Sequence, residues 1–247
     1  MTANDELALL RRTHDPASYL SAESALLNYI RIADEIAAEL RPGARILDWG
    51  CGRGQMSFLM ARRGFEVTSY DVGQSPAEKV SPLFPEIAIR IGSDPIALPY
   101  PNAGFDAVLS IGVLEHVPFP AASLAEIYRV LTPGGKLFIY NLPQRYSWPE
   151  LLRERLGLPG AHARRFTLGD VQMLLTGAGF TILRARRTNM LPKHLTSMPE
   201  ALRDAYGRLA PLNLWLDARL AAVPGVNQFA GILEAAAVKP PDEQSPA

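Results

Sequence analysis

A glycine-rich turn follows the first buried apolar run of the chain, in the stretch ILDWGCGRG at residues 46–54. Gly50, Gly52 and Gly54 allow a ligand to approach the backbone closely, and the helix expected directly afterwards offers N–H groups without partners. Asp48 stands two residues ahead of these glycines, where its carboxylate would repel a pyrophosphate and attract an ammonium or sulfonium group. The turn therefore favours a ligand that carries positive charge.

Two further acidic residues follow the next two expected strands. Asp71 comes roughly 20 residues after the first glycine, where an acidic side chain can bind ribose hydroxyls. Asp94 could accept a hydrogen bond from an exocyclic amine such as that of adenine, with Ile96 and Leu98 as an apolar surface. Because no lysine placed to bind phosphate accompanies these carboxylates, the set indicates a cationic nucleoside and not a nucleotide.

Each of these acidic residues also has a structural interpretation. Asp48 could cap the following turn or helix, Asp71 could close a turn with Gly73, and Asp94 could begin a turn at the next residue. Cys51, the single cysteine, lies between two glycines, which indicates a small residue chosen for fit more than a reactive thiol.

His116, in the segment VLEHV, follows the fourth expected strand. Its unperturbed pKa of about 6.5 suits a general base that removes a proton from a hydroxyl nucleophile. The alternative is that His116 caps or packs a short helix beside the ligand. His14, His162 and His194 are scattered and lack the spacing of metal ligands, so no metal is expected.

The elements that must position these residues alternate regularly. Apolar segments predict strands at 44–49, 65–71, 86–92, 105–112 and 135–142. Helical spacing predicts helices at 21–40, 55–63 and 121–131, and a Thr-Pro-Gly-Gly sequence at 132–135 ends the last of them. This alternation predicts an α/β fold with a mostly parallel sheet and helices on both faces. Because ligands bind at the carboxyl ends of such strands, the acidic residues and His116 should share one edge.

The second half of the chain is less regular. Residues 143–165 are rich in Pro, Gly and Arg; a helix capped by Thr167 and a strand at 180–188 follow. Next comes a largely helical insert at about 191–226, which we interpret as a lid, although a surface helix on lipid and ordinary core are alternatives. Tyr140, Tyr146 and Trp148 are candidate pocket walls. We expect a single domain, divided into a helical segment (1–42), a core (43–188), the insert (189–227), a last strand (228–240) and a disordered tail (241–247).

The charge distribution bounds the partners. Twenty-five basic residues balance twenty-five acidic ones, which argues against nucleic acid. Between residues 145 and 193, however, the sequence has nine basic residues and three acidic ones. That patch suits an acidic or lipid-like substrate or a peripheral membrane contact, or simply solvates exposed faces. The amino terminus has no apolar signal core and no stretch approaches the roughly 18 apolar residues of a membrane span, so a cytoplasmic location is expected.

Taken in order, four segments resemble the motifs of class I S-adenosylmethionine-dependent methyltransferases: ILDWGCGRGQ, YDVG, SDPIALPYPNAGFDAVLSIGVLEHV and LTPGGKLFI. The resemblance covers roughly residues 40–188 and is closest to the branch that acts on small molecules, with LEH after the fourth strand. It implies a Rossmann-like seven-stranded sheet and S-adenosyl-L-methionine as cofactor. The implied cofactor-binding residues are Asp48, Gly50, Cys51, Gly52, Gly54, Gln55, Asp71, Val72, Ser93, Asp94, Pro95 and Ile111, and His116 is the candidate catalytic residue.

The resemblance implies a role for each segment. The Gly50–Gly54 loop holds the methionine part, Asp71 bonds the ribose, and the segment after Ser93 surrounds the adenine. The family often has Asp-Ala-Glu where this chain has Asp-Pro-Ile at 94–96, which puts Pro95 in most doubt. We expect methyl transfer to a lipid-like, glycosidic or aromatic small molecule, most readily at oxygen. The alternatives are an NAD(P)-dependent oxidoreductase, against which Gln55 counts, and a non-catalytic cofactor-binding protein.

Overall fold

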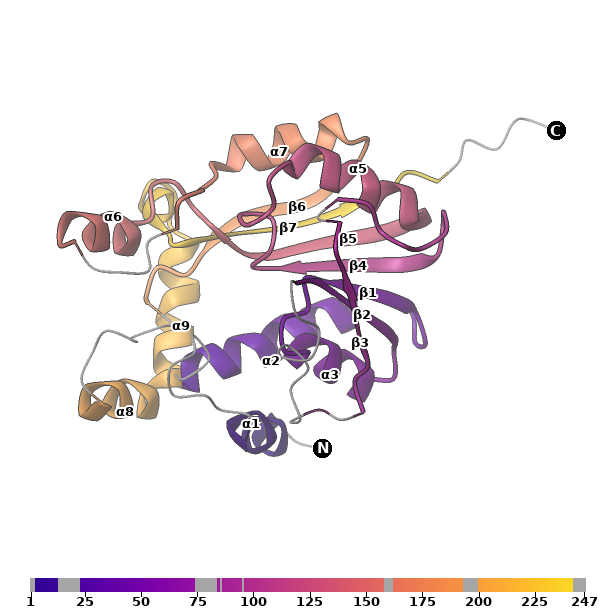
Figure 1. Cartoon of the computed structure of the whole chain (residues 1–247). Helices are drawn as coiled ribbons and strands as arrows, with labels where there is room; N and C mark the ends of the chain where they lie inside the picture. Colours follow the sequence, from indigo (N-terminus) through magenta and orange to yellow (C-terminus); the bar gives the residue numbers. More distant parts are fainter. Residues whose placement is uncertain are drawn as a thin grey trace. The chain divides into compact units, whose positions relative to one another are not determined.

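The computed structural model describes residues 3–12, 23–73, 84, 86–94, 96–157, 162–192 and 200–241. Its strands form one seven-stranded sheet in the order β3-β2-β1-β4-β5-β7-β6 (Figure 1). The strands are β1 Arg45–Trp49, β2 Glu66–Val72, β3 Ile89–Gly92, β4 Phe105–Ile111, β5 Leu131–Pro143, β6 Thr181–Thr188 and β7 Ile232–Val238.

The sheet is mostly parallel, as the sequence predicts. β1 pairs in parallel with β2 and with β4, and β2–β3 and β4–β5 are parallel pairs too. At the start of β5 the Gly134 N–H donates to the Lys239 carbonyl and the Lys239 N–H donates to the Gly135 carbonyl, so β7 runs antiparallel to β5. The chain builds β1 to β3 in one direction and then returns to place β4 beside β1. In open α/β sheets ligands bind at the carboxyl ends of the strands where the order reverses, which here are the ends of β1 and β4.

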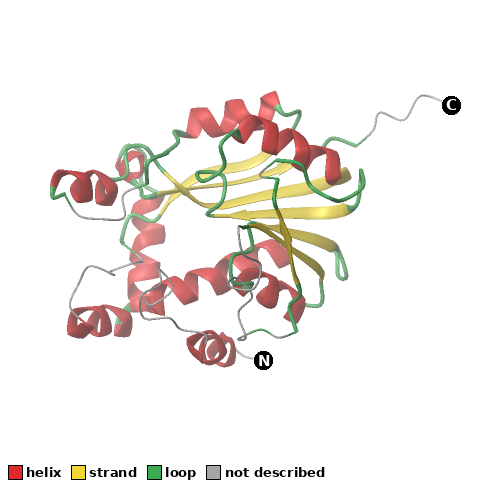
Figure 2. Cartoon of the chain, in the orientation of Figure 1, coloured by secondary structure: helices red, strands yellow, loops and turns green. Residues whose placement is uncertain are grey.

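Helices cover both faces of the sheet (Figure 2). α5 (Pro120–Val130) and α7 (Leu168–Gly177) pack on one face, and α3 (Gln55–Arg62) lies on the other. Leu124 and Ile127 of α5 and Leu175 of α7 are fully buried in the core with strand residues such as Val108. The central strands are buried on both faces, which explains their continuous apolar sequences.

Contacts divide the chain into two compact units, of which Leu40–Arg145, His162–Arg186 and Leu233–Ala247 form one that contains most of the sheet. The other comprises Met1–Glu39, Tyr146–Ala161 and Arg187–Ile232. Its elements are α1 Ala3–Arg12, α2 Glu23–Ala38, α6 Trp148–Arg155, α8 Glu200–Arg208, α9 Ala210–Ala221 and η2 Val226–Phe229. Within this unit α2 contacts α1, α8 and α9. No described helix is long and apolar enough to cross a membrane.

Two local structures differ from the sequence-based expectation. The segment 143–165 is not entirely irregular, because α6 begins within it; the Ser147 hydroxyl accepts a hydrogen bond from the Glu150 N–H at 3.4 Å and caps the helix. The residues 132–135, expected to end the preceding helix before a strand at 135–142, lie inside β5, whose pairing with β4 shifts register between Phe105 and Ala107. The expected tail lies almost wholly outside the described residues, as do His14, Lys193 and His194. The roles of the insert as a lid and of residues 1–247 as one domain stay predictions.

Candidate functional site

The glycine loop connects β1 to α3 at the carboxyl edge of the sheet. Gly50, Gly52 and Gly54 have φ angles of 72°, 57° and 81°, in the left-handed region that favours glycine. A Cβ atom on Gly50 would lie 2.5 Å from Cγ2 of Val113, whereas a Cβ atom on Gly52 would meet no described atom within 4 Å. The N-cap residue of α3 is Gly54, which has no side chain to cap the helix. The loop therefore leads into the amino-terminal end of α3 and borders, at Gly52, space that no described atom occupies.

Asp71 ties the loop to the end of β2. Its Oδ2 accepts a hydrogen bond from the Gly52 N–H at 2.8 Å, and its Oδ1 accepts one from the Val72 N–H at 2.7 Å. The alternative turn with Gly73 does not form, because the Gly73 N–H donates to the Gly92 carbonyl instead. A carboxylate oxygen can accept two hydrogen bonds, so the bonds to Gly52 and Val72 do not exclude bonds from hydroxyl groups of a ligand.

Asp48 lies inside the protein beneath the first turn of α3. The Ser57 hydroxyl donates to Oδ2 of Asp48 at 2.6 Å, and the Ser69 hydroxyl donates to the Ser57 hydroxyl at 2.7 Å. Asp48 is only 1% exposed, and burial raises its pKa to about 6. This geometry agrees with the interpretation of Asp48 as a residue that secures the following helix, and direct contact with a cationic ligand stays a prediction.

Asp94 begins a tight turn after β3. Its Oδ1 accepts hydrogen bonds from the Ile96 N–H at 2.8 Å and the Ala97 N–H at 2.9 Å, and these bonds lower the pKa of the carboxyl group. The other carboxylate oxygen takes no part in these two bonds. Ser93 and Asp94 are exposed at this edge, and Pro95 lies outside the described residues.

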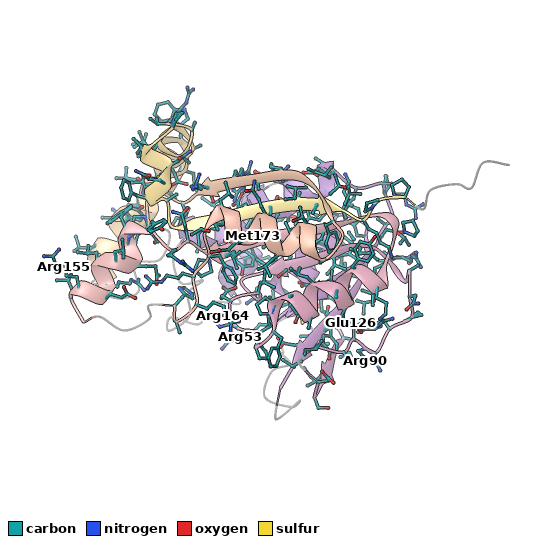
Figure 3. All side chains as sticks on the ribbon, turned by 90° about the horizontal axis from the view of Figure 1, so that it is seen from above. Arg53, Arg90, Glu126, Arg155, Arg164 and Met173 are labelled. Atoms are coloured by element: carbon teal, nitrogen blue, oxygen red, sulfur yellow. The ribbon has the colours of Figure 1, made fainter. Side chains whose placement is uncertain are left out.

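Arg129 of α5 fixes the segment that follows Asp94. Its guanidinium donates to the carbonyls of Leu98 at 3.0 Å and Tyr100 at 2.9 Å, and it pairs with Glu126, which also accepts from the Leu98 N–H at 2.8 Å. On the other side, Arg90 of β3 stacks over the Tyr100 ring at 5.3 Å; Glu126 and Arg90 are labelled in Figure 3. The candidate adenine-binding segment is therefore braced from a helix and from a strand.

Glu115 and His116 lie just beyond the carboxyl end of β4. The His116 side chain is 69% exposed and that of Glu115 is 3% exposed, and Nε2 of His116 is 3.9 Å from Oε1 of Glu115. Burial raises the pKa of Glu115 to about 7. The pKa of His116 is lowered by partial desolvation and by His162, whose ring centroid lies 6.3 Å away. His116 is therefore accessible and neutral near pH 7, which is the state a base requires.

The carboxyl edge thus collects most of the residues expected there. The Val113 side chain, just after β4, packs against Gly50 of the glycine loop, and Ile111 is the last residue of β4. Gln55 and Cys51 are mostly buried, at 7% and 8% exposure, while Val72 is 37% exposed. The sequence reasoning missed Glu115 and His162. Glu115 adjoins His116 in the quoted motif and could have been found, whereas His162 has no local signal.

The residues fit S-adenosyl-L-methionine in kind. No described atom lies within 4 Å of a Cβ atom placed on Gly52, and the Asp71 carboxylate accepts a hydrogen bond from the Gly52 N–H beside this space. When bound, this cofactor supplies a methyl group on a sulfonium centre. Among the described residues no cluster of three metal-ligating side chains occurs.

Comparison with known proteins agrees with this arrangement. The model of a family described as a methyltransferase domain matches residues 21–185. A ubiquinone biosynthesis O-methyltransferase of Xanthomonas oryzae pv. oryzae is 39% identical over 122 residues, which cover 47% of this chain and 50% of that protein. The corresponding protein of Pseudomonas aeruginosa is 36% identical over 105 residues, 40% of this chain and 45% of its own length. The chain thus spans about half the length of these curated relatives.

Solved structures show the same fold at lower identity. The 1,6-didemethyltoxoflavin-N1-methyltransferase of Burkholderia thailandensis, determined with its substrate and S-adenosylhomocysteine, is 22% identical with a TM-score of 0.56, over 97% of this chain and 91% of that one. The [4+2]-cyclase SpnF has the same identity and TM-score over 86% of this chain and 82% of its own. At this identity the likeness shows the fold, and the family match favours methyl transfer over the oxidoreductase alternative.

Proposed function

Because the chain belongs to the methyltransferase domain family, we propose that it transfers a methyl group from S-adenosyl-L-methionine to a hydroxyl oxygen of a small-molecule acceptor. The observation that carries the choice of oxygen is the pair of Glu115 and His116 at the carboxyl end of β4. A hydroxyl group must lose its proton to become a good nucleophile, and this pair offers an accessible base with a carboxylate behind it. The name of the curated relatives, O-methyltransferase, supports the same choice.

The glycine loop and Asp71 hold the cofactor in this proposal. The N–H groups at the amino-terminal end of α3 bind its carboxylate end, and Asp71 accepts hydrogen bonds from the ribose hydroxyls while it keeps Gly52 in place. The segment after Ser93, braced by Arg129, lies against the adenine. Holding the acceptor oxygen in line with the methyl group supplies much of the catalysis in such a displacement.

His116 moves the proton. Its Nδ1, the ring nitrogen that does not face Glu115, would accept the proton of the acceptor hydroxyl. The cofactor, when bound, would supply the methyl group from its sulfonium centre and leave as the neutral thioether. The resulting imidazolium is stabilised by Glu115, whose Oε1 is 3.9 Å from Nε2. Because burial raises the pKa of Glu115 to about 7, the positive charge that forms on His116 favours the ionised form of Glu115. Glu115 is thus a positioning residue and His116 the catalytic one.

A series of phenols of graded acidity tests the role of His116, with labelled methyl donor as the readout. Phenols that are neutral at the assay pH need the base, whereas phenols that are already ionised do not. The His116→Ala variant should lose about 10²–10⁴-fold in turnover with neutral phenols and little with ionised ones. Equal losses for both kinds of phenol, together with weaker binding of S-adenosylhomocysteine, would assign His116 to packing beside the cofactor.

The acceptor in this proposal is acidic or lipid-like. Support comes from the arginines of the segment 145–187 and from exposed apolar side chains of α9, which include Leu212 and Trp215 at 51% and 55% exposure.

Arg219 stacks over the Trp215 ring at 5.3 Å, which places a cation beside an exposed indole. Such a pair suits a peripheral contact with anionic membrane lipid. Sedimentation with vesicles that contain anionic lipid should retain the protein, and Trp215→Ala should weaken retention; equal binding to neutral vesicles would argue against the contact.

A further inference from the structure

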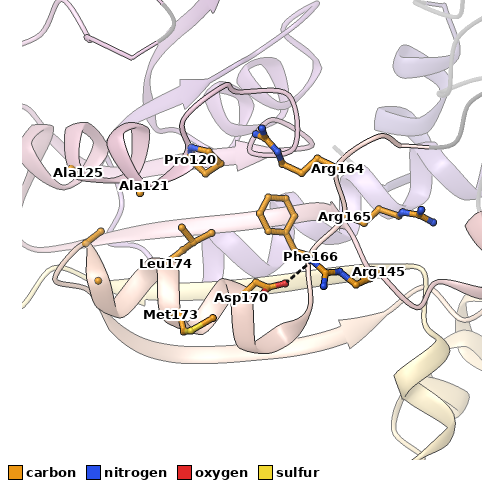
Figure 4. A pocket seen from close by; sticks show the side chains of 12 residues that line it. Pro120, Ala121, Ala125, Arg145, Arg164, Arg165, Phe166, Asp170, Met173 and Leu174 are labelled. Atoms are coloured by element: carbon orange, nitrogen blue, oxygen red, sulfur yellow. Dashed lines mark ion pairs between the residues drawn. The ribbon is translucent and has the colours of Figure 1, made fainter.

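A groove of about 630 Å³ lies between α5 and α7, on the face of the sheet that these two helices cover (Figure 4). No residue of the glycine loop lines it. Small residues explain why the two helices leave this space. Ala121 and Ala125 of α5 face Gly177 and Ala178 at the end of α7, so that no large side chain fills the gap. The volume lies within the range of about 300–1,000 Å³ that small-molecule sites occupy.

One end of the groove is cationic. Arg145, Arg164 and Arg165 gather there, against a single carboxylate, that of Asp170. Asp170 is already engaged, because its Oδ2 accepts the Thr167 N–H at 2.7 Å in the capping box of α7. The same oxygen forms an ion pair with Nη2 of Arg145 at 3.6 Å, the dashed line in Figure 4. Three guanidinium groups and one occupied carboxylate leave a net positive charge that suits an anion.

The other end of the groove is apolar. Phe166 lies between the arginines and the side chains of Met173 and Leu174, as Figure 4 shows. Phe166 is almost buried, whereas Met173 is 68% exposed at the open side, where it is labelled in Figure 3. An exposed methionine beside small residues forms a surface that can adapt to an aliphatic chain. The groove thus has a cationic head and an apolar body.

We propose that the groove between α5 and α7 binds an anionic amphiphile, in which a carboxylate or phosphate at the arginine end is carried on an aliphatic chain along α7. Neither methyl transfer nor cofactor binding enters this assignment. The head group has a direct connection to the candidate active site, because Arg164 also donates to the carbonyls of Val117 and Pro118. These two residues directly follow His116 in the chain. An anion that competes with their carbonyls for Arg164 therefore changes the local environment of His116, the proposed base.

Calorimetric titration of the full chain without cofactor tests the assignment. Octanoate and octyl phosphate carry the two head groups on the same chain, octan-1-ol has the chain without charge, and acetate has the charge without the chain. Both anionic amphiphiles should bind at least tenfold more tightly than octan-1-ol and acetate, and their ratio identifies the preferred head group. Equal binding of octan-1-ol and octanoate would overturn the proposal, as would no binding of either anion.

Variants locate the site. Arg145→Gln should lower the affinity for octanoate at least tenfold. Arg155→Gln removes an exposed arginine of α6 outside the groove and should leave this affinity unchanged. Met173→Asp places a negative charge beside the chain at an exposed position and should also weaken binding at least tenfold. Unfolding midpoints of all three variants check that the fold is retained. Equal affinity of Arg145→Gln and Arg155→Gln would place binding elsewhere and refute the assignment.

A magnetic resonance readout tests the connection to His116. Its imidazole proton signal should shift when octanoate saturates the groove, and the shift should be absent in the Met173→Asp variant. Binding without this shift would refute the connection through Arg164. Loss of methyl transfer to every acceptor would leave the binding result intact, so the two proposals fail independently.

Discussion

Replacing Gly50 by alanine should destabilise the protein more than the same replacement at Gly52. Both positions have positive φ angles, 72° and 57°, which cost an alanine about 1–2 kcal/mol. Only at Gly50 would the new Cβ meet a neighbour, at 2.5 and 2.6 Å from the two Cγ atoms of Val113. Overpacking of this kind costs about 1–3 kcal/mol. Gly50→Ala should therefore lower the free energy of unfolding by about 2–5 kcal/mol, and Gly52→Ala by about 1–2 kcal/mol.

Val113 supplies the control for this difference. Val113→Ala removes both Cγ atoms and leaves the Cβ atom 3.2 Å from the added methyl group. In a double-mutant cycle, measured by guanidinium unfolding with circular dichroism, the cost of Gly50→Ala should fall by about 1–3 kcal/mol in the Val113→Ala background. A coupling below about 0.5 kcal/mol would refute the close approach of the β4 end to the loop. Titration with S-adenosylhomocysteine should show weaker binding to Gly52→Ala, whose methyl group enters the space above the loop.

Further predictions concern the acidic residues and the brace. The pKa of Asp48 is about 6 in the folded protein and about 3.8 in the unfolded chain. The native state therefore binds more protons between these pH values, and the free energy of unfolding falls by about 3 kcal/mol as pH rises through them. Asp48→Asn should remove this pH dependence in unfolding measurements from pH 4 to 7. Asp71→Ala should weaken S-adenosylhomocysteine by about 1.5–3 kcal/mol in calorimetry, and unchanged affinity would remove Asp71 from the ribose site. Arg129→Ala should lower the unfolding free energy by about 2 kcal/mol, against less than about 0.5 kcal/mol for Arg155→Ala.

The sheet and the glycine loop follow directly from the sequence. The central strands are buried on both faces, so their apolar runs are long and easily found, and glycines with positive φ mark the turn after β1. The start of α6 could have been found too, because Ser147 and Glu150 have the spacing of a helix cap. The prolines and glycines of the same segment favour irregular structure and obscure this cap signal.

Other features depend on contacts between residues far apart in the chain. Arg129 binds carbonyls that lie 29 and 31 residues away, and nothing in the local sequence of α5 indicates these partners. The inward orientation of Asp48 depends on Ser57 and Ser69, two ordinary residues of neighbouring elements. His162 approaches His116 only because the segment after β5 returns to the edge of β4. Tertiary packing decides such features, and sequence periodicity does not report it.

The buried position of Cys51 gives the loop a chemical reporter of its own motion. It is the single cysteine of the chain and is 8% exposed, and its N–H donates to the carbonyl of Tyr70 in the neighbouring strand β2. Alkylating reagents reach a buried thiol only when the surrounding backbone opens. The rate of thiol labelling therefore counts openings of the glycine loop in the natural sequence, without any engineered probe. A ligand bound to the loop would lower the rate of thiol labelling in proportion to the fraction of protein molecules that it occupies. Labelling of Cys51 therefore measures ligand binding without knowledge of the methyl acceptor.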